Sequence, residues 1–331
     1  MKFLFYSDAH WREDRLEDLE WAHDQIGDMA VKLKVDAVIN GGDTFHDKGL
    51  IKTRVFDALY RSRKKWAEDG LKNIDIIGNH DPADKAGKIH PLKVFEEFDG
   101  WHVVDSPRYI EECGFYAVPY VKDIKSHLHD KSEFDLIAHT GVLTADMGGI
   151  KDSDSVDPKC FSGYNKVFLG HYHKRQKIKP NIYYIGSPIQ QTFAEADQKK
   201  GVLYYNRDRG TVQFIEIKGT RKHYEVVVSW DKGKPVYKKP EGLKKIDIVK
   251  FKISGTSEQV KSVSRDRLSK GLGCDQIKID RKVNDDAFSR LRIEPEETDD
   301  LRSLAAKYVD FINPDLDRKK LMEALDAVTC G

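Results

Sequence analysis

The sequence predicts a layered α/β fold with a small α/β unit and a helical tail in its C-terminal third. Over about the first 215 residues, short apolar runs rich in β-branched and aromatic residues alternate with amphipathic helical patterns. From Tyr183 onward the apolar residues recur mostly with a period of two, which favours strands. A stretch dense in Lys, Gly and Pro follows and indicates a boundary between structural units.

The expected elements of the first region follow in order along the chain. Apolar residues recur at three- and four-residue intervals over residues 16–33, which predicts an amphipathic helix. A second helix is expected over residues 53–66, where Arg63 is roughly in phase with the apolar positions. The main strand candidates are residues 2–6, 35–39, 74–77, 134–138 and 167–169.

The predicted organisation has four parts. Residues 1–217 form the core, and residues 218–283 form a linker, rich in Lys, Gly and Pro up to residue 245, followed by a small β-α-β unit. Residues 284–296 are acidic and lack an apolar pattern, so we expect a tether. Residues 297–331 predict two short helices, which bury little by themselves and are therefore expected to dock on a partner.

The overall composition constrains the function only weakly. The chain of 331 residues has 56 Lys plus Arg against 55 Asp plus Glu, so its net charge of +1 neither requires nor excludes a polyanionic partner. Its four cysteines lie far apart without CxxC spacing, which favours free thiols in a reducing compartment. No apolar run approaches the ~20 residues of a membrane span, so we expect a soluble cytoplasmic protein without membrane association.

Five short polar motifs follow the ends of expected strands, in the order SDAH, GGDTFH, GNHD, AHTG and GHYH. Open α/β sheets collect their ligands at the carboxyl ends of strands, so these motifs are expected to meet in one cleft. Two residues that lie two apart at a strand end can both turn toward one ion. The candidate metal ligands are Asp8, His10, Asp43, Asn79, His139, His171 and His173.

This ligand set is too rich for one ion, so we expect two. Nitrogen and oxygen ligands without thiolate suit Mn²⁺ best, with Fe²⁺, Zn²⁺ and Mg²⁺ as alternatives. Two such ions can activate a water and neutralise the oxygens of a phosphoryl group during in-line displacement. Asp43 is the natural bridge between them, since Gly41 and Gly42 let the backbone turn tightly beside it. Each motif alone also occurs in proteins without metal, but their ordered combination predicts a two-metal phosphoesterase.

The segments GGDTFHDK, GNHD, LGHYHK and YIGSP resemble the motifs of the calcineurin-like metallophosphoesterase superfamily. Within it, the chain is most similar to the SbcD-type recombination nucleases, including their bacteriophage versions. The resemblance covers about residues 1–215 by motif and the rest only by arrangement. It implies a core of two mixed β-sheets flanked by helices. It also implies one ion held by Asp8, His10, Asp43 and His173, and a second held by Asp43, Asn79, His139 and His171.

Catalytic roles for His80 and His46 are implied by the same resemblance. His80 matches the family's catalytic histidine, which faces the scissile phosphate and protonates or stabilises the leaving 3′ oxygen. Independently of the family, an imidazole that titrates near neutrality suits proton donation to an alkoxide. His46 matches a second family histidine near the substrate, with a structural loop histidine as the alternative. Asp81 is expected to orient His80 or to close its turn.

The resemblance further implies partners for each part of the chain. The substrate would be DNA, cleaved by double-strand exonuclease and single-strand endonuclease activity in a repair or recombination complex. This complex would act at the nucleoid, or in the host cytoplasm if the chain is viral. The small unit would contact DNA, the tail at residues 297–331 would bind the coiled coil of an SbcC-type ATPase, and the chain would form a homodimer.

Several basic residues are candidates for contacts with DNA phosphates, which position a duplex without reading its bases. Some lie on loops beside the metal motifs, and the others lie on the second helix or in the lysine-rich stretch. For the latter two groups, a solvated helix face and a solvated loop are equally good interpretations. The candidates are Lys48, Lys85, Lys88, Arg63, Lys64, Lys238 and Lys239.

Two other classes of function stand beside a DNA nuclease. A small-molecule phosphodiesterase or a phosphoprotein phosphatase could use the same fold. Phosphatases of the superfamily typically carry Asp-Arg-Gly after the second motif, whereas this chain has Asp47, Lys48 and Gly49. A metal-free interaction scaffold is the third interpretation, and candidate ligands at all five motifs argue against it.

Overall fold

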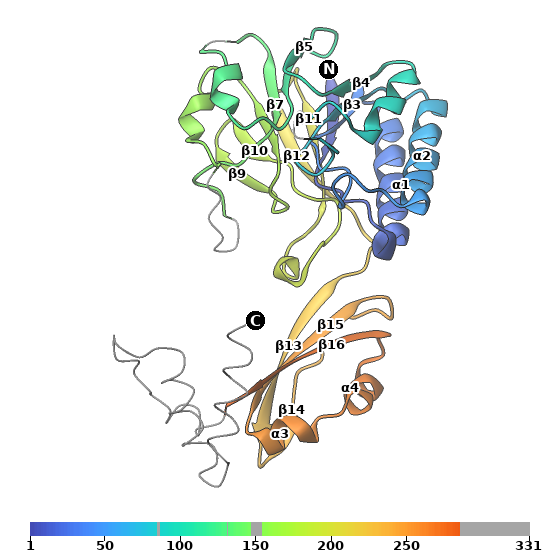
Figure 1. Cartoon of the computed structure of the whole chain (residues 1–331), viewed down its shortest axis with the longest axis vertical. Helices are drawn as coiled ribbons and strands as arrows, with labels where there is room; N and C mark the ends of the chain where they lie inside the picture. The colour runs from blue at the N-terminus through green and yellow to red at the C-terminus, as the bar shows by residue number, and fades with distance from the viewer. Residues whose placement is uncertain (85–86, 131, 147–153, 285–331) are drawn as a thin grey trace, which may run out of the picture. The chain divides into compact units, whose positions relative to one another are not determined.

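A computed structural model of the protein describes residues 1–84, 87–130, 132–146 and 154–284 (Figure 1). The larger compact unit of the chain contains Met1–Ile253 and Val263–Asp280. Its core is built on two six-stranded sheets. The prediction of two mixed β-sheets flanked by helices is confirmed.

The first sheet has the strand order β12-β11-β1-β2-β3-β4. β1 pairs in parallel with β2 and antiparallel with β11, where Lys2 lies opposite Asn206. The remaining strands β2, β3 and β4 run parallel to one another, so their carboxyl ends lie at one edge. The bounds are β1 (Lys2–Tyr6), β2 (Ala37–Asn40), β3 (Asn73–Ile76), β4 (Trp101–Val104), β11 (Gly201–Asn206) and β12 (Thr211–Glu216).

The second sheet has the order β5-β6-β7-β8-β10-β9. Its central strands β6, β7, β8 and β10 are parallel, and the two edge strands are antiparallel to their neighbours. β7 ends with the predicted ligand His139, and β8 directly precedes the predicted ligands His171 and His173. The bounds are β5 (Arg108–Ile110), β6 (Phe115–Val118), β7 (Asp135–His139), β8 (Val167–Gly170), β9 (Gln176–Lys179) and β10 (Ile182–Tyr184).

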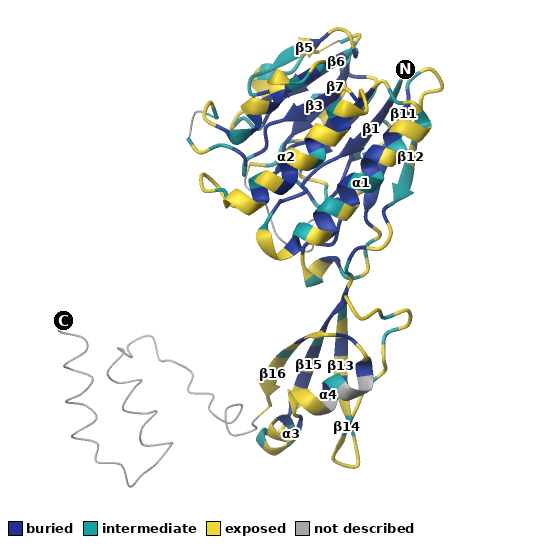
Figure 2. Cartoon of the chain, turned by 90° about the vertical axis from the view of Figure 1, so that its right-hand side faces the viewer, coloured by how far each residue is buried: buried dark blue, intermediate teal, exposed yellow. Residues whose placement is uncertain are grey.

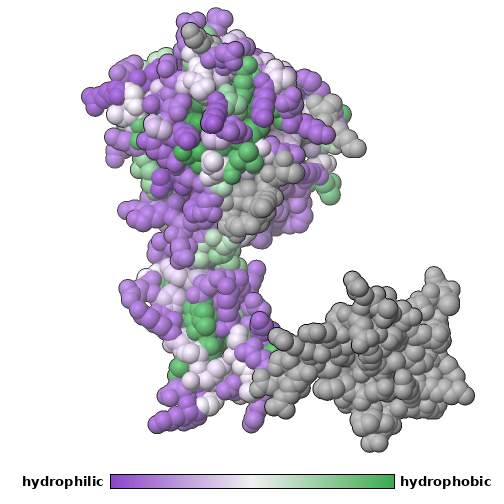
Figure 3. Space-filling model, turned by 90° about the vertical axis from the view of Figure 1, so that its left-hand side faces the viewer, coloured by the Kyte–Doolittle hydropathy of each residue, from purple (hydrophilic) through white to green (hydrophobic). Residues whose placement is uncertain are grey.

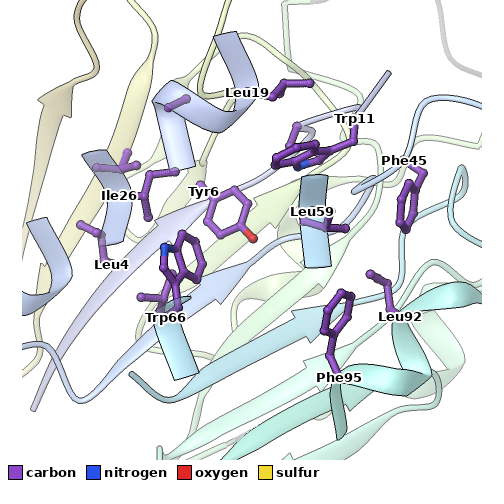
Figure 4. Packing of buried hydrophobic residues seen from close by; sticks show 14 of the residues in the cluster. Leu4, Tyr6, Trp11, Leu19, Ile26, Phe45, Leu59, Trp66, Leu92 and Phe95 are labelled. Carbon is purple, nitrogen blue, oxygen red and sulfur yellow. The ribbon is translucent and has the colours of Figure 1, made fainter. Parts of the chain in front are cut away.

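Two long helices cover the outer face of the first sheet. α1 (Leu16–Leu33) and α2 (Thr53–Glu68) lie side by side, with their buried faces toward the strands (Figure 2). Figure 4 shows the cluster between them, in which Tyr6 of β1 packs near Ile26 of α1 and Trp66 of α2. Short 3₁₀ helices occur at η1 (Glu13–Arg15), η2 (Pro91–Glu97), η3 (Ile124–His127), η4 (Pro158–Phe161) and η5 (Phe193–Glu195).

A second hydrophobic cluster joins the two sheets. Phe5 of the first sheet stacks on Phe168 of the second with ring centroids 4.0 Å apart. Phe3 meets Phe115 edge to face at 4.9 Å. These aromatic contacts bring the two sheets together face to face, so the carboxyl ends of strands from both sheets can contribute to one site.

Arg63 corrects one prediction from the sequence. Its side chain is fully buried, and its guanidinium donates to both carboxylate oxygens of Asp75, at 2.8 and 2.9 Å, and to the hydroxyl of Tyr6 at 2.7 Å. Asn40 and Asn73 also donate to this carboxylate. Arg63 therefore belongs to the core and cannot contact DNA, so its assignment as a phosphate contact is wrong.

The small unit predicted for the C-terminal third is a four-stranded sheet of order β14-β13-β15-β16 with two helices, and its residues up to Ile253 and from Val263 to Asp280 belong to the larger compact unit. Two of its strands lie within residues 218–245, so the expectation of a simple linker there is wrong. Val226 and Val228 of β13 are buried, and this alternation outweighs the surrounding lysines. The bounds are β13 (His223–Asp231), β14 (Lys234–Val236), β15 (Ile248–Gly255), β16 (Gln276–Val283), α3 (Ser257–Ser262) and α4 (Arg265–Leu272).

The surface is strongly polar. On the face shown in Figure 3, hydrophilic side chains predominate among the described residues, with small apolar patches between them. This agrees with a composition in which 34% of residues are charged. Among the residues that the structure describes, there is no helix with the length and apolarity needed to cross a membrane. The predicted tail at residues 297–331 and nearly all of the predicted tether lie outside the described residues.

Replacing Arg63 with methionine should lower the free energy of unfolding by about 3–5 kcal/mol, because Asp75 would remain as an unpaired buried charge. Urea denaturation of the two proteins followed by circular dichroism measures the difference. Lys64→Met is the matched control, since the side chain of Lys64 is exposed on the same helix. An Arg63→Met protein as stable as the wild type would contradict the role assigned to this ion pair.

Candidate metal centre

The predicted ligands meet where strands of both sheets end. Asp8 and His10 follow β1, Asp43 follows β2, and Asn79 follows β3. From the second sheet, His139 is the last residue of β7, while His171 and His173 follow β8. Three groups of potential ligand atoms form within 4.8 Å of one another: Asp8, His10 and His173; His10, Asp43 and His80; and Asp43, His139 and His171.

Backbone strain is concentrated at these ligands. Six non-glycine residues among those described have positive φ, and four of them are predicted ligands. Such conformations cost about 1–3 kcal/mol each and persist at functional sites that the surrounding structure supports. The four values are 54° for Asp8, 48° for His10, 52° for Asp43 and 103° for His171.

The first ligand group brings two imidazoles into direct contact. Nε2 of His10 and Nε2 of His173 lie 3.0 Å apart. Nδ1 of His173 donates to Glu195, so its Nε2 presents a lone pair toward His10. Two facing ring nitrogens need a shared proton or a shared cation between them. Together with the carboxylate of Asp8, these donors fit a divalent cation.

The ligand group that contains His139 and His171 is arranged in a similar way around Asn79. Its Oδ1 lies 3.0 Å from Nε2 of His139 and 3.0 Å from Nδ1 of His171. Nδ1 of His139 donates to the carbonyl oxygen of Gly41 at 2.8 Å, so in the neutral ring Nε2 carries the lone pair. An amide oxygen that faces an imidazole lone pair again fits a cation between them.

Asp43 lies between the group of Asp8, His10 and His173 and the group around Asn79. Its Oδ2 is 3.7 Å from Nε2 of His10, and its Oδ1 is 3.5 Å from Nε2 of His139. Oδ1 also accepts a hydrogen bond from the backbone amide of His80 at 2.8 Å. One carboxylate oxygen therefore faces each ligand group, which is the position that a bridging ligand requires.

The loop that follows β3 approaches Asp43 closely because residue 78 is a glycine. A Cβ atom at Gly78 would overlap the carboxylate and the backbone nitrogen of Asp43. Asp81 fixes the same approach, since its two oxygens accept hydrogen bonds from the amides of Phe45 (3.1 Å) and Gly78 (2.8 Å). Asp81 thus joins the loops after β2 and β3, in keeping with its predicted role in closing the turn.

Burial and charge set the protonation of these groups. Burial lowers the pKa of His10 to about 3, which keeps its imidazole neutral and able to bind a cation. Burial alone would raise the pKa of Asp43, but the nearby His139 and His10 hold it well below its usual range. For His139, burial opposes protonation, yet the Asp43 carboxylate raises its pKa to about 9. A proton on His139 therefore compensates the Asp43 carboxylate, and a cation bound between the two groups would take over that role.

His80 lies beside the ligands with its ring fixed by the main chain. Its Nδ1 donates to the carbonyl oxygen of His46 at 2.8 Å, which leaves Nε2 for another partner. The ring packs against His10 with centroids 4.8 Å apart. The side chain of His46 is exposed and stacks near His80 at 6.2 Å. His46 thus orients His80 through its backbone, and its own ring remains accessible.

One buried residue at the site was missed by the sequence reasoning. Glu195 accepts a hydrogen bond from Nδ1 of His173 at 2.9 Å, and Lys200 lies 2.6 Å from its other oxygen. No spacing in the sequence connects Glu195 to His173, because the two residues lie on separate segments. The only nearby signal was the YIGSP segment, whose Ser187 also contacts Lys200.

The predicted basic residues are distributed unevenly around the site. Lys48 is exposed and lines a pocket of about 520 Å³ that also includes Asn79, Tyr120 and Lys122. Lys88 is exposed and lies 4.0 Å from Asp105. Lys64, Lys238 and Lys239 are exposed but belong to α2 and the small unit, and Lys85 lies outside the described residues.

The sequence profile of the family described as Calcineurin-like phosphoesterase matches residues 1–187, which is more than half of the chain. The chain belongs to this family. The match spans the strand-end loops from Asp8 to His173. Together with the clustered ligands, it confirms the prediction of a metal-dependent phosphodiesterase.

Two relatives of this calcineurin-like phosphoesterase are named DNA double-strand break repair protein Mre11. The protein from Sulfurisphaera tokodaii is 29% identical over 240 residues, covering 65% of this chain and 60% of the relative. The protein from Halobacterium salinarum is 25% identical, covering 70% of this chain and 61% of the relative. The chain thus spans about 60% of the length of these relatives.

Among solved structures, TT1561 of Thermus thermophilus is similar to this calcineurin-like phosphoesterase. It is 12% identical, covers 66% of this chain and 99% of its own, and aligns with a TM-score of 0.40. This alignment adds no support beyond the family match.

Replacing Gly78 with alanine should weaken divalent-metal binding at least tenfold, because the new Cβ would displace the Asp43 carboxylate. Isothermal titration with Mn²⁺ measures the effect. Gly27→Ala is the control: its Cβ would overlap Trp66 in the helical layer, so it should lower stability without changing metal affinity. Equal Mn²⁺ affinities for Gly78→Ala and wild type would refute the proposed role of this close approach.

Proposed function

We propose that the chain is the nuclease subunit of a DNA repair or recombination complex of the SbcC–SbcD type. In this proposal it cleaves phosphodiesters with two Mn²⁺ ions, as a double-strand exonuclease and a single-strand endonuclease. The observation that carries the proposal is the arrangement around Asp43, whose two oxygens face separate ligand groups. The names of the two Mre11 relatives support DNA as the substrate.

Seven residues of the chain would hold the two cations, and His80 would transfer a proton. Asp8, His10, Asp43 and His173 would hold one cation, and Asp43, Asn79, His139 and His171 the other. When bound, the cations supply positive charge that neutralises phosphoryl oxygens and acidifies the attacking water. His80 would then serve as the general acid, because its ring is held by His46 and its Nε2 is available for the leaving 3′ oxygen.

The pocket beside Asn79 offers a path for the DNA strand. Lys48 and Lys122 line it together with Asp84 and Asp105, and the two lysines are the side chains that would contact phosphates flanking the scissile bond. Tyr120 also lines the pocket, and its ring centroid lies 6.3 Å from that of His171. A phosphate next to the metal centre would thus lie close to an aromatic ring as well as to the lysines.

The test uses end-labelled duplex DNA, hairpin DNA and a mononucleotide nitrophenyl ester, each with Mn²⁺, Mg²⁺ or a chelator. We expect Mn²⁺-dependent cleavage of duplex and hairpin DNA and complete loss of activity with chelator. Hydrolysis of the mononucleotide ester alone would indicate a small-molecule phosphodiesterase and contradict the proposal.

His80→Ala sharpens this test. We expect this variant to bind Mn²⁺ as the wild type does. Its rate of cleavage of duplex DNA should fall about 10²–10⁴-fold, since a general acid typically accelerates a reaction by that factor. The nitrophenyl ester should be hydrolysed at a nearly unchanged rate, because its leaving group needs no proton. An equal loss on both substrates would show that His80 acts otherwise than as a proton donor.

We also propose that residues 297–331 bind the coiled-coil ATPase of the complex and that the chain is a homodimer. Deletion of residues 297–331 should abolish association with such an ATPase in a pull-down and leave Mn²⁺-dependent cleavage of short oligonucleotides intact. These residues lie outside the described part of the chain, and the metal centre lies wholly within it. Retained association would remove the assignment of the tail.

A further inference from the structure

We propose that Glu195, paired with Lys200, is a positioning residue that fixes His173 for one of the two cations. This inference rests on the two-ion centre of the proposed function and deepens it. Glu195 ends the short helix η5 and is buried, with 6% of its surface exposed. A buried carboxylate requires compensating partners, so each of its two oxygens has to be accounted for.

The first oxygen of Glu195 determines how the His173 ring is oriented. Oε1 accepts from Nδ1 of His173 at 2.9 Å, and a carboxylate can only accept here. Nδ1 of the neutral ring therefore carries the hydrogen, and the lone pair lies on Nε2, which faces His10 at 3.0 Å. A carboxylate in this position fixes the tautomer and increases the basicity of a metal-binding imidazole.

The second oxygen of Glu195 is held by a cation and an amide. Nζ of Lys200 lies 2.6 Å from Oε2, and the amide of Gln191 donates to it at 3.1 Å. Lys200 also donates to the carbonyl oxygen of His173 at 2.8 Å and to the hydroxyl of Ser187 at 2.9 Å. Lys200 thus holds the backbone of His173 as well as the carboxylate that orients its ring.

The segment that bears Glu195 also supports the other ligands of the same ion. The side-chain amide of Gln191 donates to the carbonyl oxygen of Ala9 at 2.9 Å, between Asp8 and His10. The same side chain accepts a hydrogen bond from Arg12 at 2.6 Å. Residues 187–200 therefore connect the ligand loops that follow β1 and β8.

The two ligand groups are supported in different ways. His139, in the group around Asn79, is oriented by the backbone carbonyl of Gly41, which no substitution removes. His173 is oriented by a side chain instead. Loss of the Glu195 charge should therefore weaken one cation site selectively and leave the other close to its original affinity.

The experiment compares Mn²⁺ binding by the full chain, measured from the electron paramagnetic resonance signal of free Mn²⁺. Wild type should bind two ions, and Glu195→Gln should bind one of them 10- to 100-fold more weakly, the loss typical of such outer partners. Asp197→Asn removes the same charge from an exposed residue nearby and should bind as wild type does. The double variant Glu195→Gln/Lys200→Met leaves no unpaired buried charge and should show the same selective loss.

The outcomes separate this inference from the proposed function. Two wild-type sites that keep their affinity in Glu195→Gln would overturn the positioning role alone. Equal weakening of both sites, with a lower melting temperature of the metal-free protein, would show a structural role and also overturn it. A wild-type protein that binds fewer than two Mn²⁺ ions would overturn the two-ion centre and this inference with it.

Discussion

The hydrogen bond from His139 to the carbonyl oxygen of Gly41, at 2.8 Å, joins the two sheets at the edge where the ligands gather. The sheets approach this closely because their facing positions lack side chains. A Cβ atom at Gly170 would overlap the Gly41 carbonyl, and one at Gly42 would overlap the His139 ring. Together with the aromatic contacts between the sheets, this hydrogen bond lets the ligands from β1, β2 and β3 share a site with those from β7 and β8.

The strained ligand loops are supported by the hydrophobic core directly behind them. Trp11 follows His10, and Phe45 lies two residues after Asp43; these two aromatic residues form a parallel β-bridge and are almost fully buried. The bridge fixes the two loops relative to each other, so the positive φ angles of Asp8, His10 and Asp43 are held by packing. The geometry of the site therefore depends on apolar residues that touch no substrate.

Much of the fold and the ligand set could be predicted because each motif directly follows a strand with a clear apolar pattern. Where the residue type and the apolar periodicity gave conflicting indications, the periodicity was the better guide. Arg63 is charged but was in phase with the buried face of α2, and the structure places it in the core. The strand at His223–Asp231 was hidden by surrounding lysines although its valines alternate. Glu195 could not be found in the same way, because its contact with His173 arises only from tertiary structure.

The pairing of β1 with β11 has a consequence for how the chain folds. Lys2 lies opposite Asn206, so a strand at the centre of the first sheet gains its second neighbour only after some two hundred further residues exist. During synthesis at about 5–20 residues per second, the free edge of β1 would stay open for roughly ten seconds or longer. An open, apolar strand edge can pair with other chains, so newly made protein should depend on chaperones more than the mature enzyme does.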